Sequence, residues 1–272
     1  MGNFEGILIC SDLDETLLTT DKRVSDENKQ YIEYFMSEGG KFTFTTGRVP
    51  RGARLILDYI VPNAPIVAFN GAGLYDFARD EMTWGTYLDE HITAFLEDAE
   101  HRFKNIAINI CTDENVYFCK INEWSERYRV AEKLPPLQID YHDIPKPWKK
   151  ALFITEGGHM EEIKQGVREL NFADKFDFVR SSENYFEVLP KGASKGNGMI
   201  RLADMLGIEI SRTIALGDNE NDISMLEAAG VGVAVSNAVD SAKNVADIIT
   251  VSNNESAVAK IIKDIESGKI SV

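Results

Sequence analysis

A chain of 272 residues can hold one large domain or two smaller ones. Hydrophobic residues make up 44% and charged residues 27%, which excludes a disordered or fibrous protein. The net charge of −15 predicts repulsion from nucleic acid and from anionic membranes, so we expect neither as a partner. No apolar run approaches the roughly 18 residues that cross a bilayer, and no signal peptide is evident. The cytoplasm is therefore the expected compartment.

The first third of the chain alternates between strand and helix patterns. Residues 7–10 form a short apolar run, typical of a strand that is buried on both faces. A helix is expected to begin near Ser25 and to stop at Gly39, and strands are expected at 41–45 and 66–69. This alternation indicates a parallel sheet covered by helices.

The middle of the chain is richer in aromatic residues and in alternating patterns. Its expected elements are strands at 106–110, 116–119, 151–155, 176–179 and 185–189, and helices at 89–103 and 159–170. We interpret residues 83–189 as an inserted α+β cap domain. Residues 1–82 and 190–272 would then form one discontinuous α/β core domain.

The last third returns to the first pattern. Its expected elements are helices at 198–206, 222–229 and 255–266 and strands at 213–216 and 231–235. The three cysteines are too few and too widely spaced for a metal site. Cys10 fits a buried core position, and a bridge between Cys111 and Cys119 is the open alternative to free thiols.

Polar residues follow the expected strands at the points where the strands end. The chemically active groups are Asp12 and Asp14, Thr46 and Gly47, the region of Lys195, and Asp218 with Asn221 and Asp222. Because the carboxyl ends of parallel strands meet at one crevice, these groups are expected to converge. Four gathered carboxylates would repel one another and need a cation. Oxygen ligands without His or Cys indicate Mg²⁺.

The Asp-x-Asp spacing suggests separate roles for its two carboxylates. Asp12, at a strand end, can attack phosphorus as a nucleophile. Asp14 can offer its carbonyl to the metal and its side chain to the leaving oxygen as a general acid. The Thr46 hydroxyl can hold phosphoryl oxygens, and Lys195 can neutralise both nucleophile and phosphate.

These segments resemble the motifs of the haloacid dehalogenase-like (HAD) superfamily. The four motifs are Asp12 to Leu17, Thr46-Gly47-Arg48, Lys191 to Gly196, and Gly217 to Asp222. The insert, together with Asn70-Gly71-Ala72, resembles the Cof-type phosphatases of subclass IIB. The resemblance implies a Rossmann-like parallel-sheet core with a cap, and a Mg²⁺-dependent phosphatase that forms an aspartyl-phosphate. Small phosphomonoesters are the implied substrates, sugar phosphates ahead of nucleotide or cofactor phosphates.

The resemblance also implies individual roles. Asp12 is the nucleophile and a Mg²⁺ ligand, Asp14 the acid/base residue and a carbonyl ligand, Asp218 a ligand, and Asp222 a support of the metal shell. The residues implied in phosphate binding are Leu13, Thr46, Gly47, Lys195 and Asn221. Glu15 and Ser236 depart from the family pattern, because both stand where glycine is usual.

Structural and functional alternatives stay open. Asp12, Asp14 and Thr46 could cap turns or helices, and Lys191 competes with Lys195 for the motif lysine. Arg48 is equally suited to the surface or to substrate contact. A phosphomutase, a receiver-like signalling module and a catalytically idle binding protein are the competing functions. The presence of Asp14 argues against a dehalogenase. Neither the substrate nor the oligomeric state can be read from the sequence.

Overall fold

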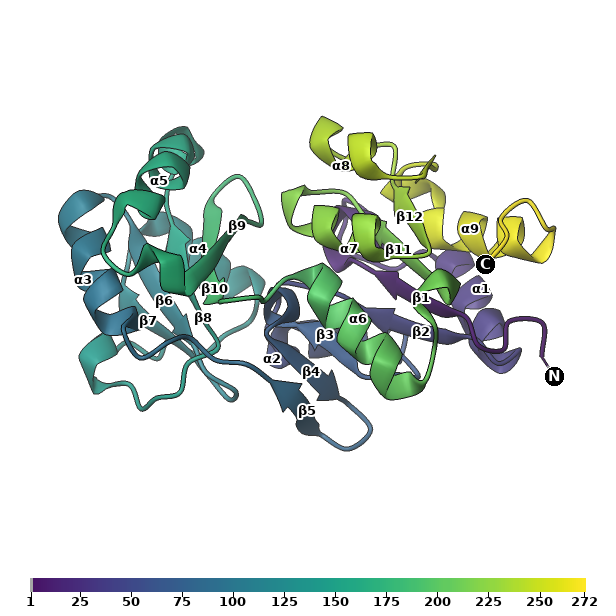
Figure 1. Ribbon diagram of the computed structural model, residues 1–272, viewed down its shortest axis with the longest axis horizontal. Coiled ribbons are helices and arrows are strands. Elements are labelled where there is room, and N and C mark those ends of the chain that lie inside the picture. Colours follow the sequence, from purple (N-terminus) through teal and green to yellow (C-terminus); the bar gives the residue numbers. More distant parts are fainter. Residues whose placement is uncertain (1) are drawn as a thin grey trace. The chain divides into compact units, whose positions relative to one another are not determined.

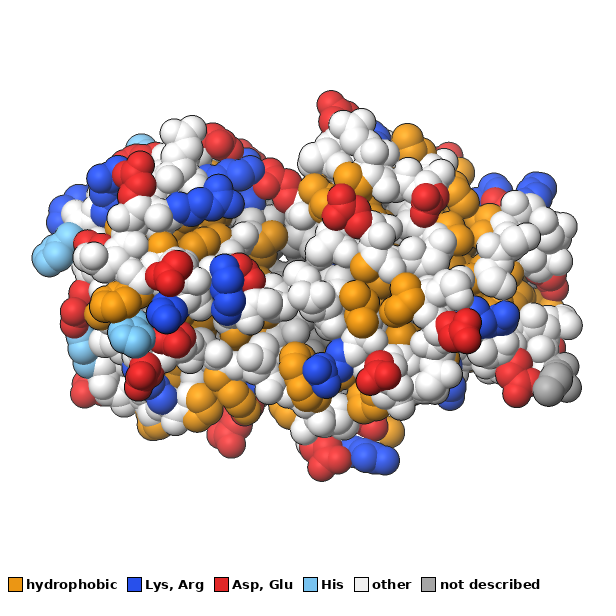
Figure 2. All heavy atoms as spheres, in the orientation of Figure 1, with side chains coloured by type: hydrophobic (Ala, Val, Ile, Leu, Met, Phe, Trp, Pro, Cys, Tyr) orange, Lys and Arg blue, Asp and Glu red, His pale blue; other side chains and the backbone are white. Residues whose placement is uncertain are grey.

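The computed structural model describes residues 2–272, and in it the chain forms two units. Unit 1 joins Met1–Trp84 to Ser194–Val272, and unit 2 spans Gly85–Ala193. Acidic and basic side chains intermingle on the surface of each unit that faces the viewer in Figure 2. Within residues 2–272, no helix combines the length and apolar character needed to cross a membrane.

Unit 1 is built on a sheet of five parallel strands in the order β13-β12-β11-β1-β2. These strands are β1 (Leu8–Ser11), β2 (Lys41–Phe44), β11 (Thr213–Gly217), β12 (Val231–Ala234) and β13 (Ile248–Ile249). Every residue of β1 and β11 is buried, as expected of central strands with helices on both faces. The predicted parallel α/β sheet is confirmed.

Helices cover both faces of this sheet (Figure 1). They are α1 (Asp26–Ser37), α2 (Pro50–Ala53), α6 (Lys195–Leu206), α7 (Ile223–Ala228), α8 (Asp240–Val245) and α9 (Ala257–Glu266). Helices α1 and α9 pack together, as do α6 and α7. Leu8 and Cys10 share a buried cluster with Met199 of α6 and Met225 of α7. Alternate residues of β1 point to opposite faces, so this period-two pattern assigns α6 and α7 to one side.

A second, smaller sheet in unit 1 corrects one expectation. Strand β3 (Ile66–Ala68) pairs antiparallel with β4 (Gly73–Asp76), which lies beside β5 (Glu81–Gly85). The segment at 66–69 was expected to continue the parallel pattern, and it does so only through one parallel bridge between Thr45 and Val67, at the end of β2. A tight turn at Phe69–Gly71 then reverses the chain into the antiparallel β4.

Unit 2 contains an antiparallel sheet in the order β7-β6-β8-β10-β9. Its strands are β6 (Ala107–Cys111), β7 (Val116–Lys120), β8 (Lys150–Ile154), β9 (Phe176–Arg180) and β10 (Tyr185–Pro190). Its helices are α3 (Ile92–Arg102), α4 (Glu123–Ala131) and α5 (Met160–Gly166). Phe95, Phe153 and Met160 belong to one apolar cluster between helices and sheet. Cys111 and Cys119, on adjacent strands, are both free thiols.

Candidate active site

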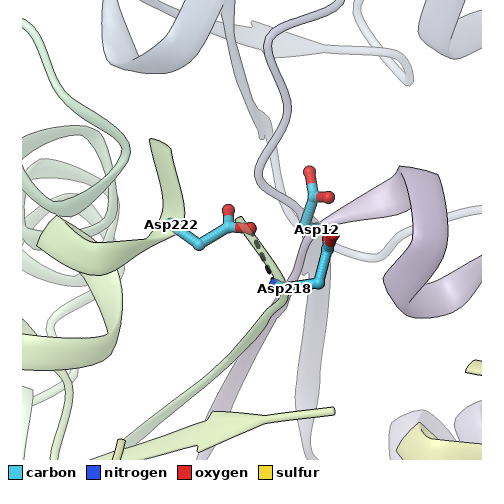
Figure 3. A group of neighbouring side chains, drawn as sticks. All are labelled: Asp12, Asp218 and Asp222. Carbon is cyan, nitrogen blue, oxygen red and sulfur yellow. Dashed lines mark hydrogen bonds between the residues drawn. The ribbon is translucent and has the colours of Figure 1, made fainter. Parts of the chain in front are cut away.

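Three carboxylates meet beside the carboxyl ends of β1 and β11. Carboxylate oxygens of Asp12, Asp218 and Asp222 lie within 4.8 Å of one another. Asp12 follows β1 directly, and its amide donates to the Leu216 carbonyl of β11 at 2.9 Å. Figure 3 shows Asp12 and Asp218 side by side, with Asp222 reaching toward them from the other side. The parallel pairing of β1 with β11 therefore brings together residues about 200 positions apart in the chain.

Lys195 is the cation that these carboxylates share. It is the first residue of α6, whose N-terminus is capped by the Ser194 hydroxyl. The Lys195 Nζ donates to Asp12 Oδ1 at 2.6 Å and to Asp222 Oδ1 at 2.5 Å. The expectation that Lys195 follows a strand of the core sheet is wrong, because it begins a helix. The competing residue Lys191 instead pairs with Asp177 at 2.9 Å in unit 2.

Asp222 has little capacity left for a metal ion. Its Oδ1 accepts from Lys195, and its Oδ2 accepts from the backbone amides of Asp218 and Asn219 at 2.9 and 3.0 Å. The side chain thus holds the loop after β11 in shape and orients Lys195. The Oδ1 of Asp218 accepts from the Thr16 hydroxyl at 2.9 Å.

Burial and like charge shift the acidity of this cluster. Desolvation, assisted by the Asp222 charge and opposed by Lys195, raises the pKa of Asp12 to about 7. Desolvation and the charges of Asp222 and Asp12 raise the pKa of Asp218 to about 9. Burial disfavours the charged form of Lys195, but Asp12 and Asp222 outweigh it and raise the pKa of Lys195 above its ordinary range. If all three carboxyl groups were ionised, they would carry more negative charge than one lysine can balance, and the raised pKa values of Asp12 and Asp218 reflect that imbalance.

The donor set fits Mg²⁺. It consists of carboxylate oxygens, and within residues 2–272 the cluster includes neither His nor Cys. The surplus negative charge is the condition that a divalent cation relieves. Asp12 and Asp218 would hold the ion with the Asp14 carbonyl, while Asp222 supports them.

Asp14 lies outside the cluster, so three carboxylates gather where four were expected. The Nε of Arg48 donates to Asp14 Oδ2 and the Nη2 to Oδ1, each at 2.9 Å, and Lys22 Nζ lies 3.2 Å from Oδ1. Partial burial acts to raise the pKa of Asp14, but Arg48 and Lys22 prevail and lower it to about 2. Sequence reasoning missed the Arg48–Asp14 pair, which joins residues 34 positions apart.

The predicted phosphate-binding residues differ in the contacts that they make. The Thr46 amide donates to the Val67 carbonyl at 2.8 Å, and its hydroxyl accepts from the Arg48 amide at 3.1 Å. The Leu13 side chain is completely buried, which leaves its backbone as the part suited to phosphate. The Asn221 Nδ2 donates to the Oδ1 of Asn70 at 3.0 Å.

Glu15 adopts the backbone conformation that explains why glycine is usual there. Its φ is 57°, in the left-handed region that side chains disfavour. Lys22 binds its Oε1 at 2.9 Å, Asn253 binds its Oε2 at 3.3 Å, and Asn237 binds its carbonyl at 2.8 Å. These contacts hold the turn after Asp14 in place without glycine. Nothing in the structure explains the serine at position 236.

Known proteins resemble this chain over almost its whole length. A family model described as haloacid dehalogenase-like hydrolase matches residues 9–262. A Streptococcus pyogenes protein that is named provisionally as a phosphatase is 31% identical to this chain, over 94% of this chain and 97% of that protein's length. A 5-amino-6-(5-phospho-D-ribitylamino)uracil phosphatase of Bacillus subtilis is 29% identical over 96% of this chain and 98% of its own.

One solved structure is described as a subclass IIB sugar phosphatase of the HAD superfamily. It has the same fold with a TM-score of 0.81, at 21% identity over 97% of this chain and 100% of its own. Together with the family match, these similarities confirm the expected fold and enzyme class. The chain therefore belongs to the haloacid dehalogenase-like hydrolases, in their Cof-type branch of phosphatases.

Proposed function

We propose that the chain is a Mg²⁺-dependent phosphatase that hydrolyses small phosphomonoesters through an aspartyl-phosphate on Asp12. The observation that carries the proposal is the buried group of Asp12, Asp218 and Asp222 around Lys195. A bound Mg²⁺ would neutralise the surplus carboxylate charge and draw the phosphoryl group toward Asp12. Lys195 orients the Asp12 carboxylate and offsets part of the same charge.

Two displacements at phosphorus complete the proposed reaction. In the first, an Asp12 carboxylate oxygen bonds to phosphorus, the ester P–O bond breaks, and the leaving oxygen takes a proton from Asp14. In the second, water attacks phosphorus and gives a proton to Asp14. The Asp12–phosphate bond then breaks, which releases inorganic phosphate and restores the free carboxylate.

The Arg48 ion pair bears on the timing of proton transfer. With its pKa near 2, the Asp14 carboxyl in this arrangement is ionised and has no proton to donate. We therefore propose that Arg48 leaves Asp14 when substrate binds and that the pKa of Asp14 rises as a result. The same ion pair also weakens Asp14 as a base, so the second displacement likewise requires that Arg48 has left Asp14.

The leaving group and the domain roles belong to the same proposal. We favour sugar phosphates, and the ribityl phosphate ester named for the B. subtilis relative adds sugar-alcohol esters to the candidates.

We assign catalysis to the core, 1–82 with 190–272, because all of the predicted site residues lie in unit 1. We assign specificity to the cap, 83–189. The cytoplasm remains the proposed compartment.

A panel of phosphomonoesters tests the proposed function. Sugar, sugar-alcohol, nucleotide and aryl phosphates should be compared with Mg²⁺ and with excess chelator, by release of inorganic phosphate. We expect hydrolysis only with Mg²⁺, and fastest for polyhydroxylated leaving groups. Acid quenching during turnover, followed by peptide mass spectrometry, should find a phosphoryl group on Asp12. Full activity in chelator, or a phosphoryl group on another residue, would contradict the mechanism.

A further inference from the structure

A turn outside the four motifs lies against the second and the fourth of them. It comprises Phe69–Gly71 and is called here the Asn70 turn. The Asn70 amide donates to the Thr46 carbonyl at 3.0 Å, and its side-chain Oδ1 accepts from the Nδ2 of Asn221 at 3.0 Å. A Cβ on Gly47 would come within 2.8 Å of the Asn70 Nδ2, so this side chain fills the space beside Gly47.

The same turn also lies against the start of the helix that bears Lys195. A Cβ on Gly71 would stand 1.9 Å from the carbonyl oxygen of Ser194, the residue that caps this helix. Phe69, Asn70 and Gly71 all have positive φ, of 54°, 52° and 95°. Two consecutive non-glycine residues in the left-handed region are energetically unfavourable, and such strain clusters at functional sites. The backbone is thus bent in the way that places Asn70 among the motifs.

In the Asn70 side-chain amide, the oxygen has a hydrogen-bond partner, whereas the nitrogen has none among residues 2–272. The residue is 1% exposed, and its Oδ1 is engaged by Asn221. Its Nδ2 is buried and has no hydrogen-bond partner anywhere in residues 2–272. Burying an amide donor without an acceptor is costly, so such a group in a native site calls for an explanation. This NH₂ can only donate, so its missing partner is an oxygen or another acceptor.

We propose that Asn70 is a further substrate-binding residue of this enzyme. Its Nδ2 donates to an oxygen of the phosphoryl group bound beside Thr46 and Gly47, and its Oδ1 turns the Asn221 amide toward the same group. The inference rests on the proposed phosphatase function. A neutral donor suits a phosphoryl oxyanion, whereas a carboxylate of the same shape at position 70 would repel it.

Asn70→Asp separates this role from a structural one. Asp tolerates the left-handed conformation as Asn does, and it keeps an oxygen that can accept from Asn221. The substitution replaces the donor with a negatively charged oxygen, so it removes the hydrogen bond and adds repulsion toward the phosphoryl group. Inorganic phosphate, titrated calorimetrically in the presence of Mg²⁺, is the probe. We expect its dissociation constant to rise, and kcat/KM for an aryl phosphate to fall, by about 10- to 100-fold. Asn70→Gly, which also accepts the positive φ, should weaken phosphate binding in the same direction.

Asn63→Asp is the matched control. Asn63 accepts from the Phe42 amide and donates to the Gly40 carbonyl, each at 2.9 Å, beside the start of β2 rather than its end. It adds the same charge to unit 1 and should lower the melting temperature while leaving phosphate affinity unchanged. Wild-type phosphate affinity in Asn70→Asp, or an equal loss in Asn63→Asp, would overturn the inference.

The Asp12→Asn variant allows the proposed phosphatase function and the proposed role of Asn70 to be tested separately. If this variant loses turnover while Asn70→Asp binds phosphate as the wild type does, the phosphatase function stands and the Asn70 role falls. If the wild-type enzyme neither hydrolyses esters nor binds phosphate, both fall. If Asp12→Asn loses turnover and Asn70→Asp loses phosphate affinity, both are supported.

Discussion

Each unit of the molecule buries a lysine against carboxylate, but the two arrangements balance charge differently. In unit 1, Lys195 faces Asp12 and Asp222, and Asp218 adds a third carboxylate nearby. In unit 2, the buried Lys150 of β8 meets the buried Glu187 of β10 at 2.6 Å. The pair in unit 2 has one charge of each sign, whereas the cluster in unit 1 has a surplus of negative charge.

This difference separates a structural ion pair from a binding site. A balanced buried pair satisfies its own members and needs no further partner, although breaking it is costly. A surplus of buried carboxylate is unfavourable for folding, and a cation or a reaction must account for it. The expected consequence is a contrast between variants. Removing a carboxylate should cost activity in unit 1 and stability in unit 2.

The largest expected effect is the loss of activity in Asp12→Asn. Turnover of a phosphomonoester should fall by at least about 10⁴-fold, since an amide oxygen is a poor nucleophile at phosphorus. The melting temperature should stay the same or rise, because one carboxylate of a surplus has been neutralised. Phosphate release and calorimetry measure the two outcomes. A clear drop in melting temperature would contradict the idea that negative charge is in surplus there.

Lys150→Met should have the next largest effect, on stability. It leaves the Glu187 carboxylate buried without a partner, which typically costs about 3–5 kcal/mol. Urea unfolding followed by a probe in unit 2 measures the loss. The double variant Lys150→Met/Glu187→Leu should recover most of it, since an apolar pair of similar size needs no charge compensation. If the double variant is no more stable than the single one, the pair does more than balance charge.

Added Mg²⁺ should stabilise unit 1 and not unit 2. At 100 times the dissociation constant, a ligand specific for the folded state adds about 2.7 kcal/mol. The melting transition of unit 1 should rise with Mg²⁺ in the wild type and in Lys150→Met, and the rise should shrink in Asp218→Asn. Differential scanning calorimetry with Mg²⁺ or chelator provides the measurement. An equal rise in Asp218→Asn would place the ion elsewhere.

The smallest expected effect is a pH dependence in unit 2. Hydrogen bonds to Glu97 and Asp140 raise the pKa of His142 above its ordinary value of 6.5. A raised pKa stabilises the fold fully below pH 6.5 and loses that contribution as the pH rises through the folded-state value. The effect should stay below about 1 kcal/mol, because the pairs are exposed. His142→Gln should flatten the stability of unit 2 between pH 6 and pH 9. An unchanged slope would assign the titration to another group.

Most of the fold of unit 1 could be predicted from its expected strands and from the polar residues directly after them. Buried apolar runs indicated β1 and β11, and the Asp residues directly after them indicated where the sheet gathers charge. The convergence followed from a rule about parallel sheets rather than from any single residue. Helix signals near Ser25 and Gly207 also held, because capping is local chemistry that a short segment carries by itself.

The side-chain pairs that could not be predicted from the sequence depend on contacts between distant segments. The pairing of Lys150 with Glu187 requires the register of two strands, and charged residues in an alternating pattern look exposed. The Arg48–Asp14 pair and the Asn70 contact to Asn221 likewise join different loops. The Asn-Gly at 70–71 was a signal that could have indicated a tight turn, because both residues favour positive φ.

The pairing of β1 with β11 has a consequence for the order of events during synthesis. Leu8 is opposite Thr213, so the centre of the core sheet can close only after more than three quarters of the chain has left the ribosome. Unit 2 is made from one continuous stretch and can complete its own sheet during that wait. Pairing across so long a separation is intrinsically slow. The nascent β1, already bearing Asp12, must therefore stay protected from aggregation until its partner strand arrives.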